Sequence, residues 1–499
     1  MPTNNWRRSL QLSVLVDGAE ARIVKGSADV EILSLSADSR ACEPGTLFAA
    51  LPGTAVDGRN FVGGAVAAGA SAVLAGDWDL DVIDSGSAAL IAADAPRRSF
   101  SLICSNFFGV QPATAIAVTG TNGKSSVTEF CRQFWSALDQ RGATIGTLGV
   151  IGPDGSASLA HTTPDPVTLH GRLRDLADEG IDRVALEASS HGLDQHRLDG
   201  VSLRAAAFTN LTQDHFDYHP SVEAYLAAKT RLFDLVVPGG TAVLNADIPE
   251  FEGLVRHCRD RGLEVVSLGE SGTNLRLIEQ ESLANGHQRL VLDAGGEPVD
   301  IELPLAGYFQ AMNMMCAAAM IAAVESLSLA EVLRLAEGLC GVRGRLEPVA
   351  GHPAGARIYV DYAHTPDALE NVLEALRGDV AGRLVVVFGC GGDRDAAKRP
   401  LMGAIARRIA DRAYVTDDNP RTEDAATIRA AVLEAVPDAL EIGDRREAIR
   451  TAVAELARGD VLVIAGKGHE PGQTVGTTVY PFDDVDEARA AIAALEGGA

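Results

Sequence analysis

The stretch AVTGTNGKSSVTEF, residues 117–130, decides the fold of the middle of the chain. It opens as an apolar run typical of a buried strand and continues after Lys124 in a pattern typical of a helix. Between the two, Gly120 and Gly123 let the backbone approach a ligand closely, while Lys124 and Ser125 add a positive charge and a hydroxyl. The stretch therefore predicts a strand, a loop that binds a polyphosphate, and a helix.

The loop departs from the common phosphate-binding motif, which places a glycine where this chain has Val118. The alternative interpretation is an ordinary glycine turn with an exposed lysine. The number of matching residues between strand and helix favours the phosphate site. The predicted contacts are Gly120, Thr121, Asn122, Gly123, Lys124, Ser125 and Ser126.

Outward from the loop, residues 95–341 alternate strand-like runs with helical stretches, which predicts a parallel sheet covered by helices. One such run, RVALE, ends at Glu187. Ligands of parallel sheets gather at the carboxyl ends of the strands. We therefore expect the Glu187 carboxylate at the sheet edge that carries the phosphate loop.

The two flanking parts have the same α/β character. Residues 1–94 alternate short apolar runs with glycine-rich turns, which predicts a small domain without a nucleotide loop. Residues 342–499 contain four apolar runs that end in polar, acidic or glycine-rich turns: RIYVDYAH, RLVVVFGCGG, RAYVTDDNP and DVLVIAGKGHE. Four such ends on one sheet edge predict one cleft. The predicted fold class is α/β, in three domains.

Composition excludes several classes of protein. The 499 residues carry a net charge of −25, so the molecule as a whole repels nucleic acid and anionic membranes. An anionic ligand must therefore meet a local cluster of basic groups. The seven cysteines form no CxxC pair, which argues against a disulfide framework and a zinc site and favours a reducing cytoplasm.

Two apolar segments could be mistaken for targeting or membrane segments. Residues 9–16, SLQLSVLV, are too short and too polar for a signal sequence, and we interpret them as a strand. The uncharged run 303–324 approaches membrane-spanning length, but Pro304, Gly307 and Asn313 favour a buried helix. We expect no membrane insertion.

Several motifs occur in a fixed order along the chain. They are DSR with PGTLFAALPG, the phosphate loop, HTTPDP, LEASSHGLDQHR, TNLTQDHFDYH, YLAAKTRLF, GRLEPV, DYAHTPDAL, GCGGDRDAAKRP, DDNPR and GKGHE. In this order they resemble the Mur ligase family, the ATP-dependent amino-acid-adding enzymes of peptidoglycan synthesis. The resemblance extends over nearly the whole chain.

The resemblance implies a small UDP-binding domain at residues 1–94, a central ATPase domain with a phosphate loop at 95–341, and a Rossmann-like amino-acid-binding domain at 342–499. It implies a cytoplasmic monomer that ligates meso-2,6-diaminopimelate to UDP-N-acetylmuramoyl-L-alanyl-D-glutamate, with ATP and Mg²⁺, through an acyl phosphate. A lysine-adding ligase of the same family is one alternative. A switch protein that hydrolyses nucleotide to change partners is an alternative from another class.

Magnesium takes few protein ligands beside phosphate oxygens and water, which makes Ser125, Glu187 and His215 candidate ligands. Taken alone, His215 fits a hydrogen-bonded core histidine better than a metal ligand. The resemblance favours the metal, because similar enzymes use this histidine for a second magnesium ion.

Lys229 shares the apolar face of its predicted helix, three or four positions from Tyr225 and Leu232. A bare ammonium in such a place is costly unless it is paired. The alternative is that the side chain extends to solvent. Similar ligases carbamylate the lysine at this place, so the resemblance implies that Lys229, together with Lys124, Glu187 and His215, belongs to the catalytic group, and that the carbamate helps to hold magnesium.

The resemblance also implies two groups of contacts for the nucleotide-sugar peptide. The uridine end is expected at Ala37, Ser39, Thr54, Ala55 and Val56. The peptide end is expected at His161, Thr162, Thr163, Ser189, Gln195 and Arg197. Hydroxyls, an amide and a guanidinium suit a ligand that bears phosphates and carboxylates, although an ordinary solvated loop has the same composition.

Arg345 and Asp361 match family residues that contact ATP, and Asn313 matches a position near the adenine. Arg345 and Asp361 lie in the third part of the chain, so the resemblance implies that the site is completed when the third domain closes on the second. An ordinary interdomain ion pair is the alternative role of Arg345.

The turn Asp418, Asn419, Pro420 and Arg421 follows a strand-like run. In the family this motif marks enzymes that add meso-diaminopimelate, whose distal carboxylate is absent from lysine. A guanidinium can pair with that carboxylate and is left unpaired by lysine. Arg394, Gly466 and Glu470 match the remaining positions of the amino-acid site, and Glu470 suits an ammonium.

Overall fold

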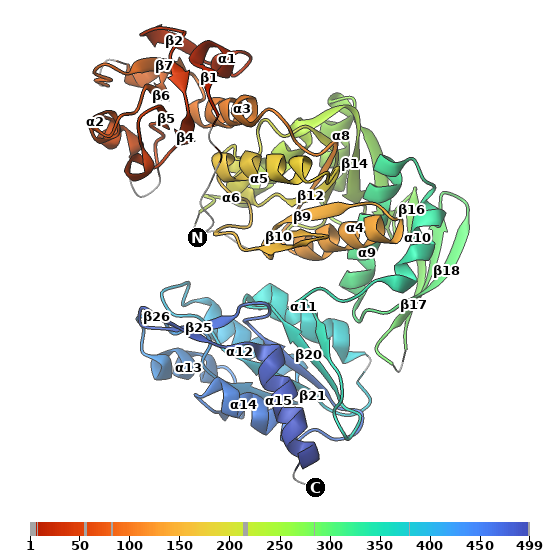
Figure 1. Cartoon of the computed structure of the whole chain (residues 1–499). Helices are drawn as coiled ribbons and strands as arrows, with labels where there is room; N and C mark the ends of the chain where they lie inside the picture. The colour runs from red at the N-terminus through yellow and green to blue at the C-terminus, as the bar shows by residue number, and fades with distance from the viewer. Residues whose placement is uncertain are drawn as a thin grey trace.

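The computed structural model describes residues 6, 8–53, 57–80, 83–212, 218–283, 285–378 and 380–497. Within them the chain forms three α/β bodies in sequence order, each around its own sheet (Figure 1). The predicted fold class is confirmed.

The first body is a five-stranded sheet in the order β2-β7-β6-β5-β4, with β2 antiparallel to its neighbour and the other pairs parallel. Alternate residues of β5 face opposite sides of the sheet: Leu47 packs with α1 and α3, and Phe48 packs with α2. The elements are β1 (Leu10–Gln11), α1 (Leu12–Val16), β2 (Arg22–Lys25), β3 (Glu31–Ile32), β4 (Ser34–Ser36), η1 (Ser39–Ala41), β5 (Thr46–Ala49), η2 (Gly58–Phe61), α2 (Val62–Ala67), β6 (Ala72–Gly76), η3 (Asp77–Asp79), β7 (Ala89–Ala93) and α3 (Pro96–Phe108).

The strand predicted over residues 9–16 is wrong for most of its length. Leu10–Gln11 pair with β3, but the next five residues form the helix α1. Leu12 and Leu15 are three positions apart, so a helical turn buries both on the α3 side, which a strand could not do.

The second body is an eleven-stranded sheet in the order β11-β10-β9-β12-β8-β13-β14-β15-β16-β17-β18. The strands from β9 to β16 in this order are parallel, as predicted, and antiparallel strands extend both edges. The strands are β8 (Thr114–Thr119), β9 (Gly142–Gly146), β10 (Gly149–Gly152), β11 (Gly155–Ala157), β12 (Arg183–Glu187), β13 (Leu203–Phe208), β14 (Val236–Asn245), β15 (Glu264–Gly269), β16 (Leu275–Ser282), β17 (Gln288–Ala294) and β18 (Pro298–Leu303).

Helices cover both faces of this sheet. One face packs against α4 and α9, which contact each other, and the other packs against α5, α6 and α8. The helices are α4 (Lys124–Ala137), α5 (Pro166–Asp178), α6 (Ser190–Asp194), α7 (Val222–Thr230), η4 (Arg231–Leu235), α8 (Phe251–Asp260), α9 (Tyr308–Glu325), α10 (Leu329–Leu333) and η5 (Arg334–Gly338).

The uncharged run 303–324 contributes most of α9, and most of the alanines and methionines of this helix are buried against α4 and the sheet. The predicted buried helix is confirmed. Among the residues that the structure describes, no helix is long and apolar enough to cross a membrane. The seven cysteines are free thiols.

The third body is a six-stranded sheet in the order β19-β20-β24-β21-β22-β23, parallel except for β19. Its faces pack against α11, α12 and α13 on one side and α14 and α15 on the other. The elements are β19 (Glu347–Val349), β20 (Arg357–Asp361), α11 (Pro366–Arg377), β21 (Leu384–Phe388), α12 (Lys398–Ile409), β22 (Arg412–Val415), α13 (Ala425–Leu433), β23 (Leu440–Glu441), α14 (Arg445–Ala454), β24 (Val461–Ala465), β25 (Gly472–Val475), β26 (Thr478–Pro481) and α15 (Asp484–Gly497).

The four runs predicted to end at one edge of the third sheet are β20, β24, β21 and β22, which are consecutive and parallel. Their carboxyl ends therefore meet, as predicted. In Figure 1, α11 of this body lies beneath the α4 and α9 side of the central body.

Candidate active site

The predicted phosphate loop joins β8 to α4. Gly120 and Gly123 have φ angles of 144° and 92°, a region that favours glycine. A Cβ atom at Gly120 would lie 1.9 Å from Thr209 Oγ1, and one at Gly123 would lie 2.4 Å from Asn313 Oδ1. Both positions therefore require glycine for conformation and for space.

The end of the neighbouring strand β13 fixes the shape of the loop. Thr209 Oγ1 donates to the Asn122 carbonyl at 2.6 Å, and the Asn122 N–H donates to Asn210 Oδ1 at 2.9 Å. The loop leads directly into the first turn of α4, whose N-terminus carries a partial positive charge. A rigid loop at a helix N-terminus suits an anion such as a phosphate.

Lys124 folds back over this loop. Its Nζ donates to the carbonyl oxygens of Gly120 and Thr121, both at 2.9 Å. Ser125 and Ser126, the next two residues, are buried in the first turn of α4. The positive charge and the hydroxyls predicted from the sequence therefore lie together at one end of the helix.

Lys229 lies beneath the same loop. Its side chain is buried, with 1% of the residue exposed, and its Nζ donates to the Gly120 carbonyl at 2.7 Å. The same nitrogen lies 4.4 Å from the centroid of the Tyr225 ring, close enough for a cation–π contact. The alternative in which this side chain extends to solvent is therefore wrong, and the apolar-face prediction is right.

Glu187 ends β12, which pairs in parallel with β8, so its carboxylate lies on the edge that carries the phosphate loop. The side chain is buried. Its two oxygens accept from the Thr147 N–H at 2.9 Å and the Thr147 hydroxyl at 3.0 Å. Thr147 thus fixes the carboxylate, and each oxygen keeps a further lone pair.

His215 lies outside the described residues. Among those that are described, no group of three or more His, Cys, Asp or Glu side chains could hold a metal ion. The oxygen donors in the region are the Ser125 hydroxyl and the Glu187 carboxylate, which are the hard ligands that Mg²⁺ prefers. The Lys229 ammonium, in contrast, would repel a cation.

The residues expected at the peptide end of the substrate gather beside Glu187. Thr163 Oγ1 donates to the Glu187 carbonyl at 2.8 Å, and the Thr162 and Thr147 hydroxyl oxygens are 3.0 Å apart. His161 is exposed at the start of this segment.

Gln195 and Arg197 form one polar unit near these threonines. Arg197 donates to Gln195 Oε1 at 2.8 Å and to the Thr163 carbonyl at 2.7 Å, and burial lowers the pKa of its guanidinium. Ser189, in contrast, caps α6, because its hydroxyl accepts from the Gly192 N–H at 3.1 Å. The structure therefore gives Ser189 a local structural role as well.

The expected uridine contacts lie in the first body. Ala37 is exposed, and Ser39 begins the short helix η1, which the Asp38 side chain caps. Thr54, Ala55 and Val56 lie outside the described residues. Figure 1 shows this body as a separate unit beside α5 and α6. The residues expected at the peptide end lie just outside the ends of these two helices.

The third body reaches the phosphate loop through Arg345. Its Nη2 lies 3.5 Å from Ser125 Oγ, and its guanidinium stacks 4.6 Å from the centroid of the Tyr362 ring. Asn313, on α9, lies against Gly123 and donates to Gln310. Arg345, predicted to contact ATP, and Asn313, predicted to lie near the adenine, thus both border the loop.

Asp361, the other residue of the third part predicted to contact ATP, lies among backbone N–H groups, and its contact with ATP stays a prediction. It is buried, and its two oxygens accept from the N–H groups of Leu346 and Ala363 at 2.7 and 2.8 Å. Burial raises the pKa of this carboxyl, and the positive charge of Arg345 opposes the rise. Asp361 therefore holds the turn that presents Arg345.

Asp367, which we did not predict as a site residue, links the two bodies at the loop. Its Oδ2 accepts from Asn122 Nδ2 and from the Thr212 hydroxyl, both at 2.9 Å. Asp367 lies in the first turn of α11. The signal was present in the DYAHTPDAL motif, but nothing in the local sequence says that this turn faces a loop 245 residues away.

The residues predicted for the amino-acid site meet at the carboxyl ends of β21, β22 and β24. Arg421 has a φ of 51° and donates from Nη1 to the Gly392 carbonyl at 2.7 Å. A Cβ at Gly391 would lie 2.9 Å from Arg421 Nη1 and 3.9 Å from Arg394 Cγ, so the two arginines flank one glycine.

Asp418 and Asn419, on the acidic side of this site, are more deeply buried than the two arginines. Asn419 donates to Glu470 Oε2 at 2.9 Å. Asp418 is buried, and a Cβ at Gly466 would lie 3.1 Å from its Oδ2. Pro420 precedes Arg421 in the same turn. Basic groups on one side and acidic groups on the other suit a zwitterionic amino acid.

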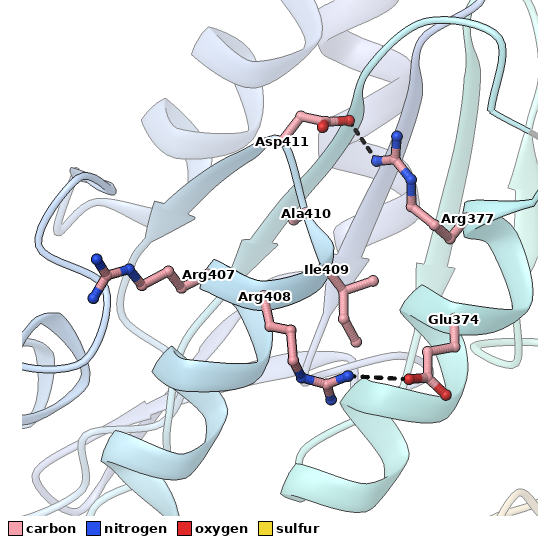
Figure 2. Close-up of a pocket in the computed structure, with 7 residues that line it drawn as sticks. All are labelled: Glu374, Arg377, Arg407, Arg408, Ile409, Ala410 and Asp411. Carbon is pink, nitrogen blue, oxygen red and sulfur yellow. Dashed lines mark hydrogen bonds and ion pairs between the residues drawn. The ribbon is translucent and has the colours of Figure 1, made fainter.

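A separate hollow of 560 Å³ lies at the amino ends of β21 and β22, on the opposite edge of the third sheet. Figure 2 shows two of its three arginines in ion pairs, Arg377 with Asp411 and Arg408 with Glu374. Because these charges are balanced by exposed carboxylates, the hollow is not a candidate for the anionic ligand.

Three family models match the chain in order. They are the Mur ligase family, catalytic domain, at residues 31–99, the Mur ligase middle domain at 118–321, and the Mur ligase, glutamate ligase domain at 344–468. One match falls in each of the three bodies of the structure.

The chain is also similar to proteins of known name over almost its whole length. A protein of Caulobacter vibrioides named UDP-N-acetylmuramoyl-L-alanyl-D-glutamate--2,6-diaminopimelate ligase is 52% identical over 478 residues, which are 94% of this chain and 97% of that protein. A protein of Agrobacterium fabrum with the same name is 50% identical over 469 residues, 94% of each. A solved structure of a ligase with this name has a TM-score of 0.72 at 32% identity and covers 98% of this chain and all of its own.

Proposed function

The chain belongs to the Mur ligase family, and we propose that it joins meso-2,6-diaminopimelate to UDP-N-acetylmuramoyl-L-alanyl-D-glutamate with ATP, a step of peptidoglycan precursor synthesis. The observation that carries this proposal is the 52% identity to a diaminopimelate ligase over 94% of the chain. The relatives' names support diaminopimelate rather than lysine as the added amino acid.

The reaction forms an amide from an unreactive carboxylate. The terminal phosphoryl group of ATP passes to the side-chain carboxylate of D-glutamate, which gives an acyl phosphate and ADP. The amine of diaminopimelate then attacks the acyl carbon and forms a tetrahedral intermediate. The bond between the acyl carbon and the phosphate oxygen then breaks, and inorganic phosphate leaves. The amine loses a proton as the amide forms. No protein nucleophile takes part.

The phosphate loop supplies the electrostatic stabilisation that this chemistry needs. Lys124, the N–H groups of the loop and the N-terminus of α4 lie where the anionic phosphates would meet the anionic acceptor. Arg345 adds a positive charge from the third body. We propose Asn313 as a neighbour of the nucleotide, because it lies against Gly123.

Magnesium fits the donors in this region. We propose that the Ser125 hydroxyl and the Glu187 carboxylate hold it, with His215 as a further ligand. When bound, magnesium would neutralise charge on the phosphate oxygens. Thr147 would keep the Glu187 carboxylate oriented through its two hydrogen bonds.

We propose that Lys229 is carbamylated. The Lys229 ammonium would first lose a proton, and the resulting amine would then add to CO₂ and lose a second proton, which turns a buried cation into an anion. The carbamate nitrogen keeps one N–H, so the bond to the Gly120 carbonyl, now 2.7 Å long, can persist. The change would remove the buried positive charge that otherwise conflicts with a magnesium site beside it.

This modification can be tested directly. The protein incubated with ¹³C-labelled bicarbonate should give a carbamate carbon signal in NMR that is absent from Lys229→Ala. An unmodified amine by mass or density, or full activity of Lys229→Ala, would remove the proposal.

We propose a division of roles among the three parts. Residues 1–94 bind the uridine end through Ala37, Ser39 and the segment 54–56, and residues 95–341 bind ATP and the peptide end. Residues 342–499 bind diaminopimelate, with Arg394 and Arg421 on its distal carboxylate and Glu470 on its ammonium. Free cysteines throughout the chain suit a reducing cytoplasm, where we place the protein as a monomer.

One assay tests the main proposal. The protein is given ATP, Mg²⁺ and the UDP-linked dipeptide with a panel of amino acids, and phosphate release is measured. We expect release to require both the dipeptide and meso-diaminopimelate. Preferred use of lysine would favour the other ligase, and release stimulated by a protein partner would favour a nucleotide switch.

A further inference from the structure

Lys467 is a fully buried lysine inside the amino-acid site, and it is not among the residues predicted from the sequence. It follows β24, between Gly466 and the turn that ends at Glu470, and none of its surface is exposed. Its Nζ lies 3.2 Å from Asn419 Oδ1 and 3.2 Å from Glu470 Oε2. The lysine thus joins the DNPR turn to the GKGHE turn.

These contacts fix the orientation of the Asn419 amide. Its oxygen accepts from Lys467 Nζ and from the Thr474 N–H at 2.9 Å, and its NH₂ group donates to Glu470 Oε2 at 2.9 Å. The rotated amide would place its NH₂ group against the lysine ammonium and would lose each of these bonds.

The same contacts orient the Glu470 carboxylate. Oε2 accepts from both Asn419 and Lys467, while the side chain remains 33% exposed. Among the described residues no donor is recorded for Oε1, which is therefore left for a ligand. A carboxylate held by two donors on one oxygen presents the other oxygen in a fixed direction.

Further charges surround this group. Arg445 and Asp484 form a fully buried ion pair at 2.7 Å, and Arg445 also donates to the Ala465 carbonyl beside Gly466. Together with Asp418, the cluster holds two cations, Lys467 and Arg445, and three carboxylates.

We propose that Lys467 is a positioning residue for the amino acid, because it holds Glu470 and Asn419 in the arrangement that receives the substrate ammonium. The proposal rests on the proposed function and deepens it. Lys467 is too deeply buried to touch the substrate, so its effect on binding passes through Glu470. It should therefore change the KM for diaminopimelate and leave ATP binding unchanged.

The test uses the full-length protein and begins with the wild type, whose diaminopimelate-dependent phosphate release must be present. Lys467→Met keeps the length of the side chain and removes the charge and the donors. We expect the KM for diaminopimelate to rise about 10- to 100-fold, as for loss of a charged hydrogen bond. The KM values for ATP and for the UDP-linked dipeptide should stay within about twofold.

Asp460→Asn is the matched control. Asp460 is as buried as Lys467 and lies at the opposite end of the same strand, where it accepts from Arg383 and the Ala457 N–H. It should lower stability without changing the KM for diaminopimelate. If Lys467→Met does not fold, Lys467→Gln, which fills the space and keeps a neutral donor, replaces it.

A double-mutant cycle with Glu470→Gln separates positioning from stability. If Lys467 acts through Glu470, Lys467→Met should change the KM for diaminopimelate by less than about twofold when it is introduced into the Glu470→Gln variant. Full additivity, or an unchanged KM for diaminopimelate in the folded Lys467 variant, would overturn the proposal while the ligase function stands. A wild type that does not use diaminopimelate would instead overturn the proposed function.

Discussion

The phosphate loop of the central sheet and the amino-acid site of the third sheet occupy the same kind of place, the carboxyl ends of parallel strands, but they are built differently. The loop is a contiguous run of eight residues, 119–126, shaped by two glycines and backbone groups. The amino-acid site draws side chains from three separate turns, at residues 391–394, 418–421 and 466–470.

The difference also extends to how each site handles charge. In the loop, Lys124 donates to the carbonyls of Gly120 and Thr121, and Lys229 beneath it donates to the same Gly120 carbonyl. The amino-acid site instead contains a fully buried ion pair, Arg445 with Asp484, and a partly buried one, Lys467 with Glu470. A phosphate site thus needs preorganised dipoles and one charge, whereas selection of a zwitterion needs several side-chain charges in fixed positions.

The largest effect is expected in the loop. Lys124→Met should lower kcat about 1,000-fold, because one preorganised charge opposite the transferred phosphoryl group is lost. ADP release at saturating substrates measures it. The exposed Arg141→Met, which breaks only a surface pair with Asp154, is the control. A loss below tenfold would mean that the loop acts through its backbone alone.

The next largest effect is expected on the free energy of unfolding of the third body. Arg445→Met should destabilise this body by about 3–5 kcal/mol, since it leaves Asp484 buried and unpaired. Hydrogen exchange of the β24 amides reports the local opening free energy. The double variant Arg445→Met/Asp484→Leu should recover much of the loss. Equal losses in the single and double variants would mean that packing, not charge, dominates here.

The third effect is on the KM for diaminopimelate, and it distinguishes the amino-acid site from the phosphate loop. Arg421→Ala should raise the KM for diaminopimelate about 100-fold, because the distal carboxylate loses its charged partner, and should leave the KM for ATP within about twofold. Steady-state kinetics with each substrate varied in turn measures both. Arg407→Ala, an exposed arginine on the opposite edge of the same sheet, should change neither. Equal damage to both KM values would erase the distinction between the sites.

The smallest expected effect is on the KM for ATP, and it tests the contact between the third body and the phosphate loop. Asp367→Asn keeps the acceptor and removes the charge that holds Asn122 and Thr212, so the KM for ATP should rise about 5- to 10-fold. Nucleotide titration by calorimetry checks the same change in Kd. Glu370→Gln, on the outer side of the same helix beside Arg408, is the control. No change in Asp367→Asn would leave the third body linked to the loop through Arg345 instead.

Much of the candidate site could be predicted from short stretches of sequence. The strand, loop and helix around Lys124 follow from residues within a few positions of one another, and so do the buried helix α9 and the acidic end of β12. The helical spacing also put Lys229 on an apolar face. Residues 12–16 misled us because an alternating apolar run fits a strand as well as a short helix. His215 and residues 54–56 stay predictions.

Contacts between distant segments could not be predicted in this way. Asn122 and Asp367 are 245 positions apart, Lys229 and Gly120 are 109 apart, and Lys467 and Asn419 are 48 apart. In the third sheet the strands lie in the order β20-β24-β21-β22, which differs from their order in the sequence. This order is set by how helices pack on both faces of the sheet. Local patterns carry no information on it.

The sequence by itself determined the α/β class, the phosphate loop and the residue types of each site, because backbone conformation and apolar periodicity depend on near neighbours. Only the tertiary structure decided that Lys229 points at a loop carbonyl, that Asp367 reaches across from the third body, and that Lys467 orders the amino-acid site. The physical reason is that a buried charge is tolerated only where partners from distant segments of the chain satisfy it, and only the packing of sheets and helices brings those partners within hydrogen-bond distance.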